Sequence, residues 1–449
     1  MTRLDELKGK VLEKVKEDDV KFANLQFTDI QGAIKSVTIT VEHLETSLDD
    51  GTWFDGSSIE GFARIHESDM ILKPDPATYA ILPWEPQEKK VARFFADVYR
   101  PDGKPFEGDP RYILKRAIEK AEKMGYQFNT GPELEFFLFK TDNGKISPVP
   151  HDVGGYFDYS ARDMASDVRR GIVFALESFG MHVEMSHHEV APGQHEIDVR
   201  FSDALSSADN SITLKHTVKS IAQLHDLYGT FMPKPIYGIN GSGMHVHQSL
   251  FDTKTGKTAF FDGKDPYHLS KTAYGFIAGQ LEHVRAMSAV LAPTVNSYKR
   301  LVPGYEAPVY ICWGKINRSA LIRIPRYSPG REQSTRAELR CPDPSCNPYL
   351  AFAVMLHAGL DGIKRKLKPP NPVEEDVYEF DNKKLDEMYI KTLPASLGEA
   401  LDEMRKSKLV REALGEHTFE NYLTAKRMEW DEYRTNVSDW EITKYLEKL

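Results

Sequence analysis

The sequence has 449 residues, with 58 basic and 67 acidic side chains and a formal net charge of −9 at pH 7. Because binding along nucleic acid needs clustered Lys and Arg to displace counterions, this balance argues against a nucleic-acid-binding protein. A hydrophobic fraction of 41% is typical of a globular chain, and three cysteines are too few for a disulfide framework. The N-terminus lacks a signal-peptide core and no long uninterrupted apolar stretch follows, so we expect a cytoplasmic protein outside membranes.

The length predicts about two to four domains, and the first of these begins with a helix and several strands. Apolar residues at helical spacing from Leu4 to Val15 predict an amphipathic helix. Alternating residues from Ala23 to Ile39, interrupted by a turn, predict a β-hairpin. Another strand is expected over Val91–Tyr99, closed by a turn at 101–105.

A domain boundary is expected at that turn. It gives an N-terminal domain of residues 1–105 and a larger domain of residues 106–449. Asp109 is placed to cap the first helix of the larger domain. Helical stretches then alternate with strands, which is an α+β pattern, until a proline-rich linker at 369–376 leads into a charged helical tail.

Four predicted strands of the larger domain combine an apolar face with a face of charged or histidine side chains. Residues two apart on a strand point to the same face, so Glu133 and Glu135 lie side by side about 7 Å apart. The same alternation places Phe201 on an apolar face with Ile197 and Val199. The other charged faces carry Gln194, Glu196, Asp198 and Arg200 on one strand, His245 and His247 on the next, and Arg336, Glu338 and Arg340 on the last.

The charged faces of these strands have two possible interpretations. Solvent-exposed faces are usual in antiparallel sheets, but such faces are normally rich in Lys, Thr and Ser. Glu, His and Arg dominate here, and the nearby glycines at 131, 193, 241 and 243 suggest close approach of a ligand to the backbone. We therefore favour a polar channel over a solvent face.

The residue types in this channel predict metal and phosphate chemistry. Carboxylates with one imidazole suit Mg²⁺ or Mn²⁺, and six such ligands suit two or more ions. Arginine binds phosphate and carboxylate oxygens through paired N–H groups. Together they point to ATP, although the sequence contains neither a P-loop nor a GxGxxG fingerprint. The arginines in question are Arg300, Arg318, Arg323, Arg336 and Arg340.

Seven longer motifs follow one another along the chain. They are FDGSS at 54–58, GPELEFFLF at 131–139, HHEVAPGQHEID at 187–198, NGSGMHVHQS at 240–249, NSYKRLVPGYEAPVY at 296–310, NRSALIRIP at 317–325 and RAELRCPDPSCNPYLA at 336–351. With these motifs in family order, the chain resembles type I glutamine synthetases over essentially its whole length, and within them the alpha-type subfamily.

The resemblance implies a fold, an assembly and an activity. The fold would be α+β, with an N-terminal β-grasp-like domain and a catalytic domain whose curved antiparallel sheet lines a funnel-shaped active site. The assembly would be a homo-dodecamer of two stacked hexameric rings, with active sites between adjacent subunits. The implied activity is ATP-dependent synthesis of glutamine from glutamate and ammonium through γ-glutamyl phosphate, in central nitrogen assimilation.

The resemblance also implies roles for individual residues. One metal would be held by Glu135, Glu189 and Glu196, and a second by Glu133, His245 and Glu338. Glutamate would be bound by Asn240, Gly241, Arg300, Arg318 and Arg340, and ATP by Glu184, Phe201, His247, Ser249, Arg323 and Arg336.

Catalysis would further involve Arg318, Asp55 and Glu306. Asp55, supplied by a neighbouring subunit, would bind ammonium and accept its proton, and Glu306 would close over the intermediate. His187 and His188 are expected to hydrogen-bond near the ligands or at an interface rather than to ligate.

Regulation and two alternatives stay open. Arg64 resembles the arginine that mediates glutamine feedback in the alpha subfamily, and a nitrogen-regulatory protein is a further partner that the resemblance allows. The stretch 328–335 departs from the family pattern, which leaves its nucleotide contacts undefined.

One alternative function is that of a γ-glutamyl ligase that uses a larger amine, against which Asp55 and Glu306 argue. The other is a non-catalytic relative, against which the complete set of metal ligands argues.

Overall fold

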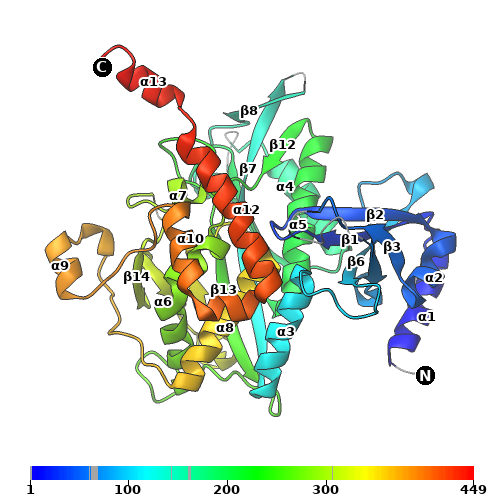
Figure 1. Ribbon diagram of the computed structural model, residues 1–449, viewed down its shortest axis with the longest axis horizontal. Coiled ribbons are helices and arrows are strands. Elements are labelled where there is room, and N and C mark those ends of the chain that lie inside the picture. The colour runs from blue at the N-terminus through cyan, green and yellow to red at the C-terminus, as the bar shows by residue number, and fades with distance from the viewer. Residues whose placement is uncertain (1–2, 60, 62–68, 143, 160–162, 306) are drawn as a thin grey trace.

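The computed structural model of the chain (Figure 1) describes residues 3–59, 61, 69–142, 144–159, 163–305 and 307–449. Arg64 and Glu306, to which the sequence assigned regulation and closure, lie outside the described residues. None of the helices in the described part combines the length and apolar character needed to span a lipid bilayer.

The N-terminal part is a sheet with the order β2-β1-β6-β4-β3, to which β5 adds by pairing with β6. Helix α1 (Arg3–Glu17) packs on it through Val11 and Val15, which join Leu25 and Phe94 in one apolar core. The strands are β1 (Phe22–Thr28), β2 (Ile34–Thr40), β3 (Thr52–Asp55), β4 (Asp69–Pro74), β5 (Ala80–Ile81) and β6 (Val91–Tyr99), and α2 (Leu44–Asp49) precedes β3.

The elements predicted for this part are confirmed. The hairpin is the antiparallel pair β1–β2, in which Leu25 lies opposite Val37. The predicted strand at 91–99 is β6, which pairs in parallel with β1. Asp109 caps the next helix, α3 (Pro110–Lys123), by accepting a hydrogen bond from the backbone N–H of Arg111 at 2.9 Å.

The larger part is built on a second sheet, with the order β14-β15-β16-β13-β7-β10-β9 in the described residues. The long central strand β7 also pairs with β8, β11 and β12. All pairs are antiparallel except β14 with β15, so the sheet predicted as antiparallel is mixed at that edge. The strands are β7 (Tyr126–Asp142), β8 (Lys145–Pro150), β9 (Val183–His188), β10 (Gln194–Val199), β11 (Ser202–Asp203), β12 (Leu227–Thr230), β13 (Met244–Asp252), β14 (Tyr310–Gly314), β15 (Ala320–Arg323) and β16 (Ala337–Leu339).

Helices enclose the apolar face of this sheet, and the predicted α+β architecture is confirmed. The helices α6 and α8 approach so closely that a Cβ atom on Gly279 would lie 2.0 Å from the carbonyl oxygen of Ala358. The short α13 at the C-terminus projects from the body of the molecule (Figure 1). The helices after α3 are α4 (Ser166–Ser178), α5 (Ala204–Leu224), α6 (Lys271–Leu291), α7 (Ser297–Arg300), α8 (Pro348–Arg365), α9 (Asn382–Glu387), α10 (Leu397–Lys406), α11 (Lys408–Leu414), α12 (Glu416–Thr435) and α13 (Asp439–Tyr445).

A buried arginine ties the N-terminal sheet to two helices of the larger part. Arg111 of α3 forms ion pairs with Asp97 of β6 at 2.7 Å, with Asp75 at 2.8 Å and with Asp209 of α5 at 2.9 Å. Because a buried guanidinium with three carboxylate partners is costly to separate from them, this cluster holds the N-terminal sheet against α3 and α5.

Candidate active site

A cavity of about 260 Å³ opens on the polar face of the second sheet. It is lined by every residue that the sequence assigned to metal, and by every described residue assigned to glutamate. Those residues are Glu133, Glu135, Glu189, Glu196, His245 and Glu338 for metal, and Asn240, Gly241, Arg300, Arg318 and Arg340 for glutamate. The remaining lining residues are Tyr156, Val190, Gln194, Tyr305 and Arg323.

The first group of possible metal ligands comes from three neighbouring strands. Glu133 of β7 lies opposite His245 of β13 in the strand register, and Glu338 belongs to β16 on the other side of β13. Nδ1 of His245 lies 3.6 Å from Oε2 of Glu133 and 3.9 Å from Oε1 of Glu338. One donor atom from each residue lies within 4.8 Å of the others, so the predicted trio is brought together.

Two arginines neutralise Glu338, which is fully buried. Arg340 donates to Oε1 at 2.5 Å, and Nε of Arg323 donates to Oε2 at 2.6 Å. Burial alone would raise the pKa of Glu338, but the charge of Arg340, together with those of His247, His245 and Arg323, outweighs it and lowers that pKa. The carboxylate is therefore ionised, with one arginine at each of its oxygens.

The second group of possible metal ligands differs from the predicted one. Glu189 and Glu196 converge as expected, but the third member within 4.8 Å is His187 rather than Glu135. Nε2 of His187 lies 3.0 Å from Oε1 of Glu189 and 3.5 Å from Oε2 of Glu196. Glu135 lines the same cavity, where it accepts hydrogen bonds from Gln194 at 3.1 Å and from the backbone N–H of Gly243 at 2.9 Å.

Carboxyl groups are crowded in and beside this cavity, and the pKa values of some of them are raised. Burial, and then the charge of Glu189, raises the pKa of Glu135 to about 8. Burial, and then the charge of Glu135, raises the pKa of Glu196 far above its usual range. Burial also raises the pKa of Asp198, which lies two residues after Glu196 on β10 and outside this cavity, to about 6, with the charge of Glu133 as the next cause. Carboxylates in this state favour a bound divalent cation, because a cation stabilises their ionised form.

Backbone carbonyl groups hold Arg300, one of the predicted glutamate-binding residues, and Lys234 beside Asn240. The guanidinium of Arg300 is buried and donates to the carbonyl oxygens of Cys341 at 3.0 Å and Pro342 at 3.2 Å. Lys234 donates through Nζ to the carbonyl oxygen of Ile239, next to Asn240. The same Nζ lies 3.8 Å from the ring centroid of Tyr305, so one ammonium group bridges two walls of the cavity.

A second cavity of about 560 Å³ meets the first at Glu133, which lines both. Glu184, Phe201, His247, Ser249 and Arg336, which were assigned to ATP, line it. The remaining residue of that set, Arg323, lies in the first cavity instead. Four residues from the stretch left undefined by the sequence also line the second cavity, namely Gly330, Arg331, Gln333 and Ser334.

The predicted position of Phe201 on an apolar strand face is wrong. The strand β10 ends at Val199, and its register with β9 shifts between Asp198 and Val199. Phe201 consequently leaves the alternation and lies on the second cavity, half exposed, as the family resemblance implied. Gly131 makes room for it, since a Cβ atom there would lie 3.1 Å from Cβ of Phe201.

His247 connects the two cavities. Its Nε2 lies 2.7 Å from Oε1 of Glu133, and its Nδ1 accepts a hydrogen bond from Nε of Arg336 at 3.1 Å. Because a guanidinium can only donate, Nδ1 carries the lone pair and Nε2 donates to Glu133. This chain of contacts runs from the possible metal ligands to the wall of the second cavity.

Among the described residues, Asp55 is the predicted catalytic residue that this chain does not bring to the site. It ends β3 in the N-terminal sheet, is exposed, and does not line either cavity. It accepts a hydrogen bond from the backbone N–H of Ser57 at 2.8 Å, and the hydrogen bonds from Ser57 lower the pKa of Asp55. Its carboxylate is therefore ionised at neutral pH.

Several cavity residues were not assigned a role from sequence. Gln194 shares a strand face with Glu196 and could have been found from that pattern, whereas Tyr156 lies in an irregular segment with no periodic signal. A larger hollow of about 1050 Å³ lies between α6 and the C-terminal helices, but none of the possible metal-ligand groups lines it. The site chemistry therefore belongs to the two smaller cavities.

Two family models together match most of the chain. The family described as "Glutamine synthetase, catalytic domain" matches residues 107–445, and the family described as "Glutamine synthetase, beta-Grasp domain" matches residues 19–101. The glutamine synthetase of Methanosarcina mazei is 58% identical over 443 residues, covering 98% of each chain. That of Thermus thermophilus is 54% identical over 444 residues and also covers 98% of each chain.

Solved structures share the same fold over almost the whole length. The structure described as "GmaS/ADP complex-Conformation 1" superposes with a TM-score of 0.88 at 32% sequence identity. It covers 97% of this chain and 99% of its own. The structure described as "Apo GmaS without ligand" gives a TM-score of 0.87 with the same coverage.

Proposed function

The chain belongs to the glutamine synthetase family and is a glutamate–ammonia ligase. On that premise, we propose which of its residues act in each step of the reaction. ATP bound in the second cavity transfers its γ-phosphoryl group to the side-chain carboxylate of glutamate in the first. Ammonia then displaces phosphate from γ-glutamyl phosphate and forms glutamine. The observation that carries this proposal is the pair of cavities that meet at Glu133.

The residues at the junction fit divalent cations, because their donors are carboxylates and imidazoles. Glu133, His245 and Glu338 would hold one ion, and Glu189 and Glu196 would hold a second together with Glu135 or His187. When bound, Mg²⁺ or Mn²⁺ supplies charge neutralisation and orientation for the transferring phosphoryl group.

Different arginines would bind the two anionic substrates, glutamate and ATP. Arg300 and Arg340 are buried at the first cavity and would bind glutamate, with Arg318 at the exposed side of the cavity. Arg336 faces the second cavity and would bind ATP phosphates. Asp55 from a neighbouring subunit would bind ammonium and accept its proton. Glu306, outside the described residues, would exclude water from the acyl phosphate.

An amine-dependence assay tests the activity directly. Phosphate release would be followed with ATP, Mg²⁺ and glutamate, first with ammonium and then with methylamine or without any amine. We expect turnover that depends on ammonium and exceeds that with methylamine. Preference for methylamine would favour a γ-glutamyl ligase with a larger substrate, and no turnover with any amine would favour a non-catalytic relative.

Replacing Gly241 with Ala is expected to weaken glutamate binding. A Cβ atom there would lie 2.2 Å from the carbonyl oxygen of Pro233, which already accepts the N–H of Ser242 at 2.8 Å. Overpacking of this kind shifts the backbone at a cost of about 1–3 kcal/mol. A cost of that size expressed in binding corresponds to a rise of about 5- to 150-fold in the KM for glutamate. Steady-state kinetics at saturating ATP measure it. Gly9→Ala, with nothing within 4 Å of its new Cβ atom, is the control. An unchanged KM in Gly241→Ala would contradict the assignment.

Metal binding is expected to release protons. Since the pKa of Glu135 is about 8, this carboxyl is mostly protonated at pH 7 before a cation binds. A cation favours the ionised form, so binding of Mg²⁺ should release about one proton or more per site, with affinity rising toward pH 8. Calorimetric titrations in buffers of different ionisation enthalpy count the protons. Glu135→Gln should release fewer, and heats that do not depend on the buffer would refute the expectation.

The remaining expectations are proposals about assembly and regulation. We propose a homo-dodecamer of two stacked hexameric rings, supported by the exposed position of Asp55 outside both cavities. Glutamine feedback through Arg64, a nitrogen-regulatory protein partner and a role in nitrogen assimilation rest on family resemblance. The domain limits of 1–105 and 106–449 are supported by the family matches, which meet between 101 and 107. The cytoplasm is the proposed compartment, in keeping with the free, buried cysteines.

A further inference from the structure

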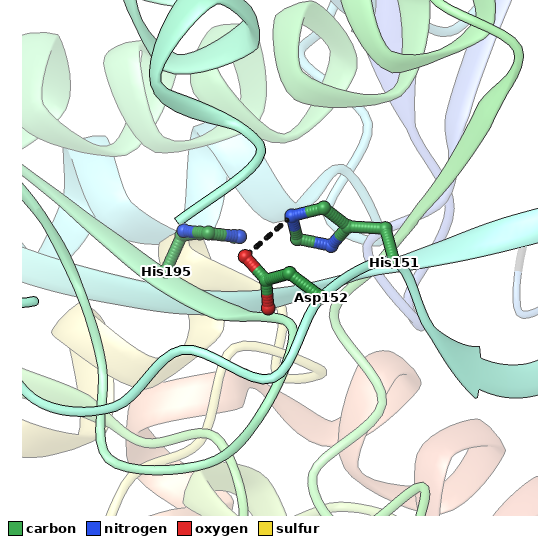
Figure 2. Close-up of side chains that lie close together, drawn as sticks. All are labelled: His151, Asp152 and His195. Atoms are coloured by element: carbon green, nitrogen blue, oxygen red, sulfur yellow. Dashed lines mark ion pairs between the residues drawn. The ribbon is translucent and has the colours of Figure 1, made fainter. Parts of the chain in front are cut away.

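A buried cluster of histidines and aspartates lies beneath β9 and β10, the strands on either side of the turn that carries Glu189. In the β9–β10 pair, His187 lies opposite Glu196 and His188 lies opposite His195. Because neighbouring pairs point to opposite faces of a sheet, the first pair faces the cavity and the second faces the interior. Both His188 and His195 are essentially fully buried. Figure 2 shows His195 pointing toward Asp152 and His151, which follow β8.

Asp152 is the centre of this cluster, and its side chain is fully buried. Oδ1 accepts hydrogen bonds from the backbone N–H of Gly193 at 2.9 Å and from Nε2 of His188 at 3.1 Å. Oδ2 accepts the backbone N–H of Met164 at 3.2 Å and lies 2.9 Å from Nε2 of His151. Both carboxylate oxygens therefore accept hydrogen bonds, from three separate positions in the chain, and His151 lies beside Oδ2.

These contacts enclose the turn that carries Glu189. The turn leaves β9 after His188 and enters β10 after Gly193, so a single oxygen of Asp152 holds both of its ends. His188 also donates from Nδ1 to the carbonyl oxygen of Glu189 at 2.7 Å. The imidazole thus links the aspartate directly to the backbone of the possible metal ligand.

The cluster has the spacing of a metal centre, but its hydrogen bonds favour another role. Donor atoms of His151, Asp152 and His195 all lie within 4.8 Å of one another. However, Arg169 lies 2.9 Å from Nδ1 of His195, and a guanidinium can only donate. Nδ1 therefore carries the lone pair and Nε2 carries the hydrogen, which leaves His195 without a free nitrogen for a metal.

We propose that Asp152 is a positioning residue that holds Glu189 in the cavity through His188 and Gly193. This inference rests on the proposed function, in which Glu189 binds a divalent cation. Hydrogen-bonded groups behind a metal ligand fix its orientation, and their loss typically weakens metal binding by about 10–100-fold. Asp152 acts through an imidazole and a backbone N–H, so the lower end of that range applies.

The test measures Mn²⁺ affinity by calorimetry, together with thermal stability, in four variants. Asp152→Asn should weaken Mn²⁺ binding about tenfold, because an amide has a single accepting oxygen whereas Asp152 accepts N–H groups through both Oδ1 and Oδ2. Gly154→Ala provides a second route, since its Cβ atom would lie 2.6 Å from Nε2 of His188 and displace the ring from Asp152. Asp209→Asn, which disturbs a buried aspartate far from the cavities, should lower stability without changing Mn²⁺ affinity.

Glu189→Gln separates this inference from the function on which it rests. Weaker binding in Glu189→Gln and unchanged binding in both Asp152→Asn and Gly154→Ala would overturn the positioning role alone. Unchanged binding in Glu189→Gln would overturn the proposed role of Glu189 itself. A zinc ion that survives chelation in the unmodified protein and is lost in Asp152→Asn would also overturn the proposal, in favour of a metal centre at the cluster.

Discussion

Glu338→Gln should abolish almost all turnover while leaving the fold in place. The carboxylate is fully buried between Arg323 and Arg340 and lies 3.9 Å from His245, so it is the most enclosed of the proposed ligands. A catalytic metal contributes several kcal/mol of charge stabilisation, and about 4 kcal/mol corresponds to about a thousand-fold in rate. The glutamine side chain keeps the size of the original and can still accept one arginine N–H. Ammonium-dependent phosphate release and circular dichroism together measure the outcome.

The control for Glu338→Gln is the same chemical change outside the cavities. Glu374 accepts hydrogen bonds from the backbone N–H of Lys315 at 3.0 Å and Ile316 at 2.9 Å, and from the hydroxyl of Tyr267. Glu374→Gln should therefore affect stability slightly and turnover hardly at all. Near-normal turnover in Glu338→Gln would contradict the assignment of Glu338 as a metal ligand. If this variant does not fold, His245→Gln tests the same metal site.

Asp55→Asn should lower kcat/KM for ammonium by about 100- to 1000-fold, because proton acceptance by a placed carboxylate contributes about that much. Binding of ATP and glutamate should be retained, since Asp55 does not line either cavity of its own chain. Asp49→Asn is the matched control: Asp49 is exposed in the same domain and pairs with Lys8 at 2.8 Å. A normal kcat/KM for ammonium in Asp55→Asn would refute the catalytic role.

The same variant also tests whether sites are shared between subunits. If Asp55 comes from a neighbour, a mixed assembly of Asp55→Asn and Glu338→Gln chains contains sites in which both native residues meet. Random equal mixing in a closed ring should restore about a quarter of the sites. Co-expression of two differently tagged chains, followed by tandem purification and assay, measures the recovery. Activity no higher than that of the separate variants would show that the two residues do not combine across an interface.

The polar face of the second sheet could be predicted because strand alternation has a fixed period. Glu133 and Glu135 lie in the middle of a long regular strand, so nothing interrupts the count that places them on one face. Phe201 follows a register shift, and the same count fails there. Alternation is reliable only where pairing is continuous, and the sequence contains no marker for that shift.

Contacts between residues from distant segments of the chain were harder to predict from the sequence. Asp152 and His188 are separated by 36 positions, and neither belongs to a periodic pattern that would relate them. The flanking glycines were expected to mark ligand approach, yet Gly243 makes room for a protein group. A Cβ atom there would lie 2.5 Å from a terminal nitrogen of Arg300. Such packing depends on tertiary distances that composition and spacing do not contain.

The strand β7 places limits on how this chain can change. Glu133 and Glu135 are two positions apart on it, and the strand is paired on both sides along that stretch. A single inserted or deleted residue between them would turn one carboxylate away from the cavity and toward the apolar core. The turn at 253–257 after β13 carries no cavity residue and can change length without moving either carboxylate. Insertions and deletions in this turn are therefore compatible with the chemistry of the site, whereas those between the two glutamates of β7 are not.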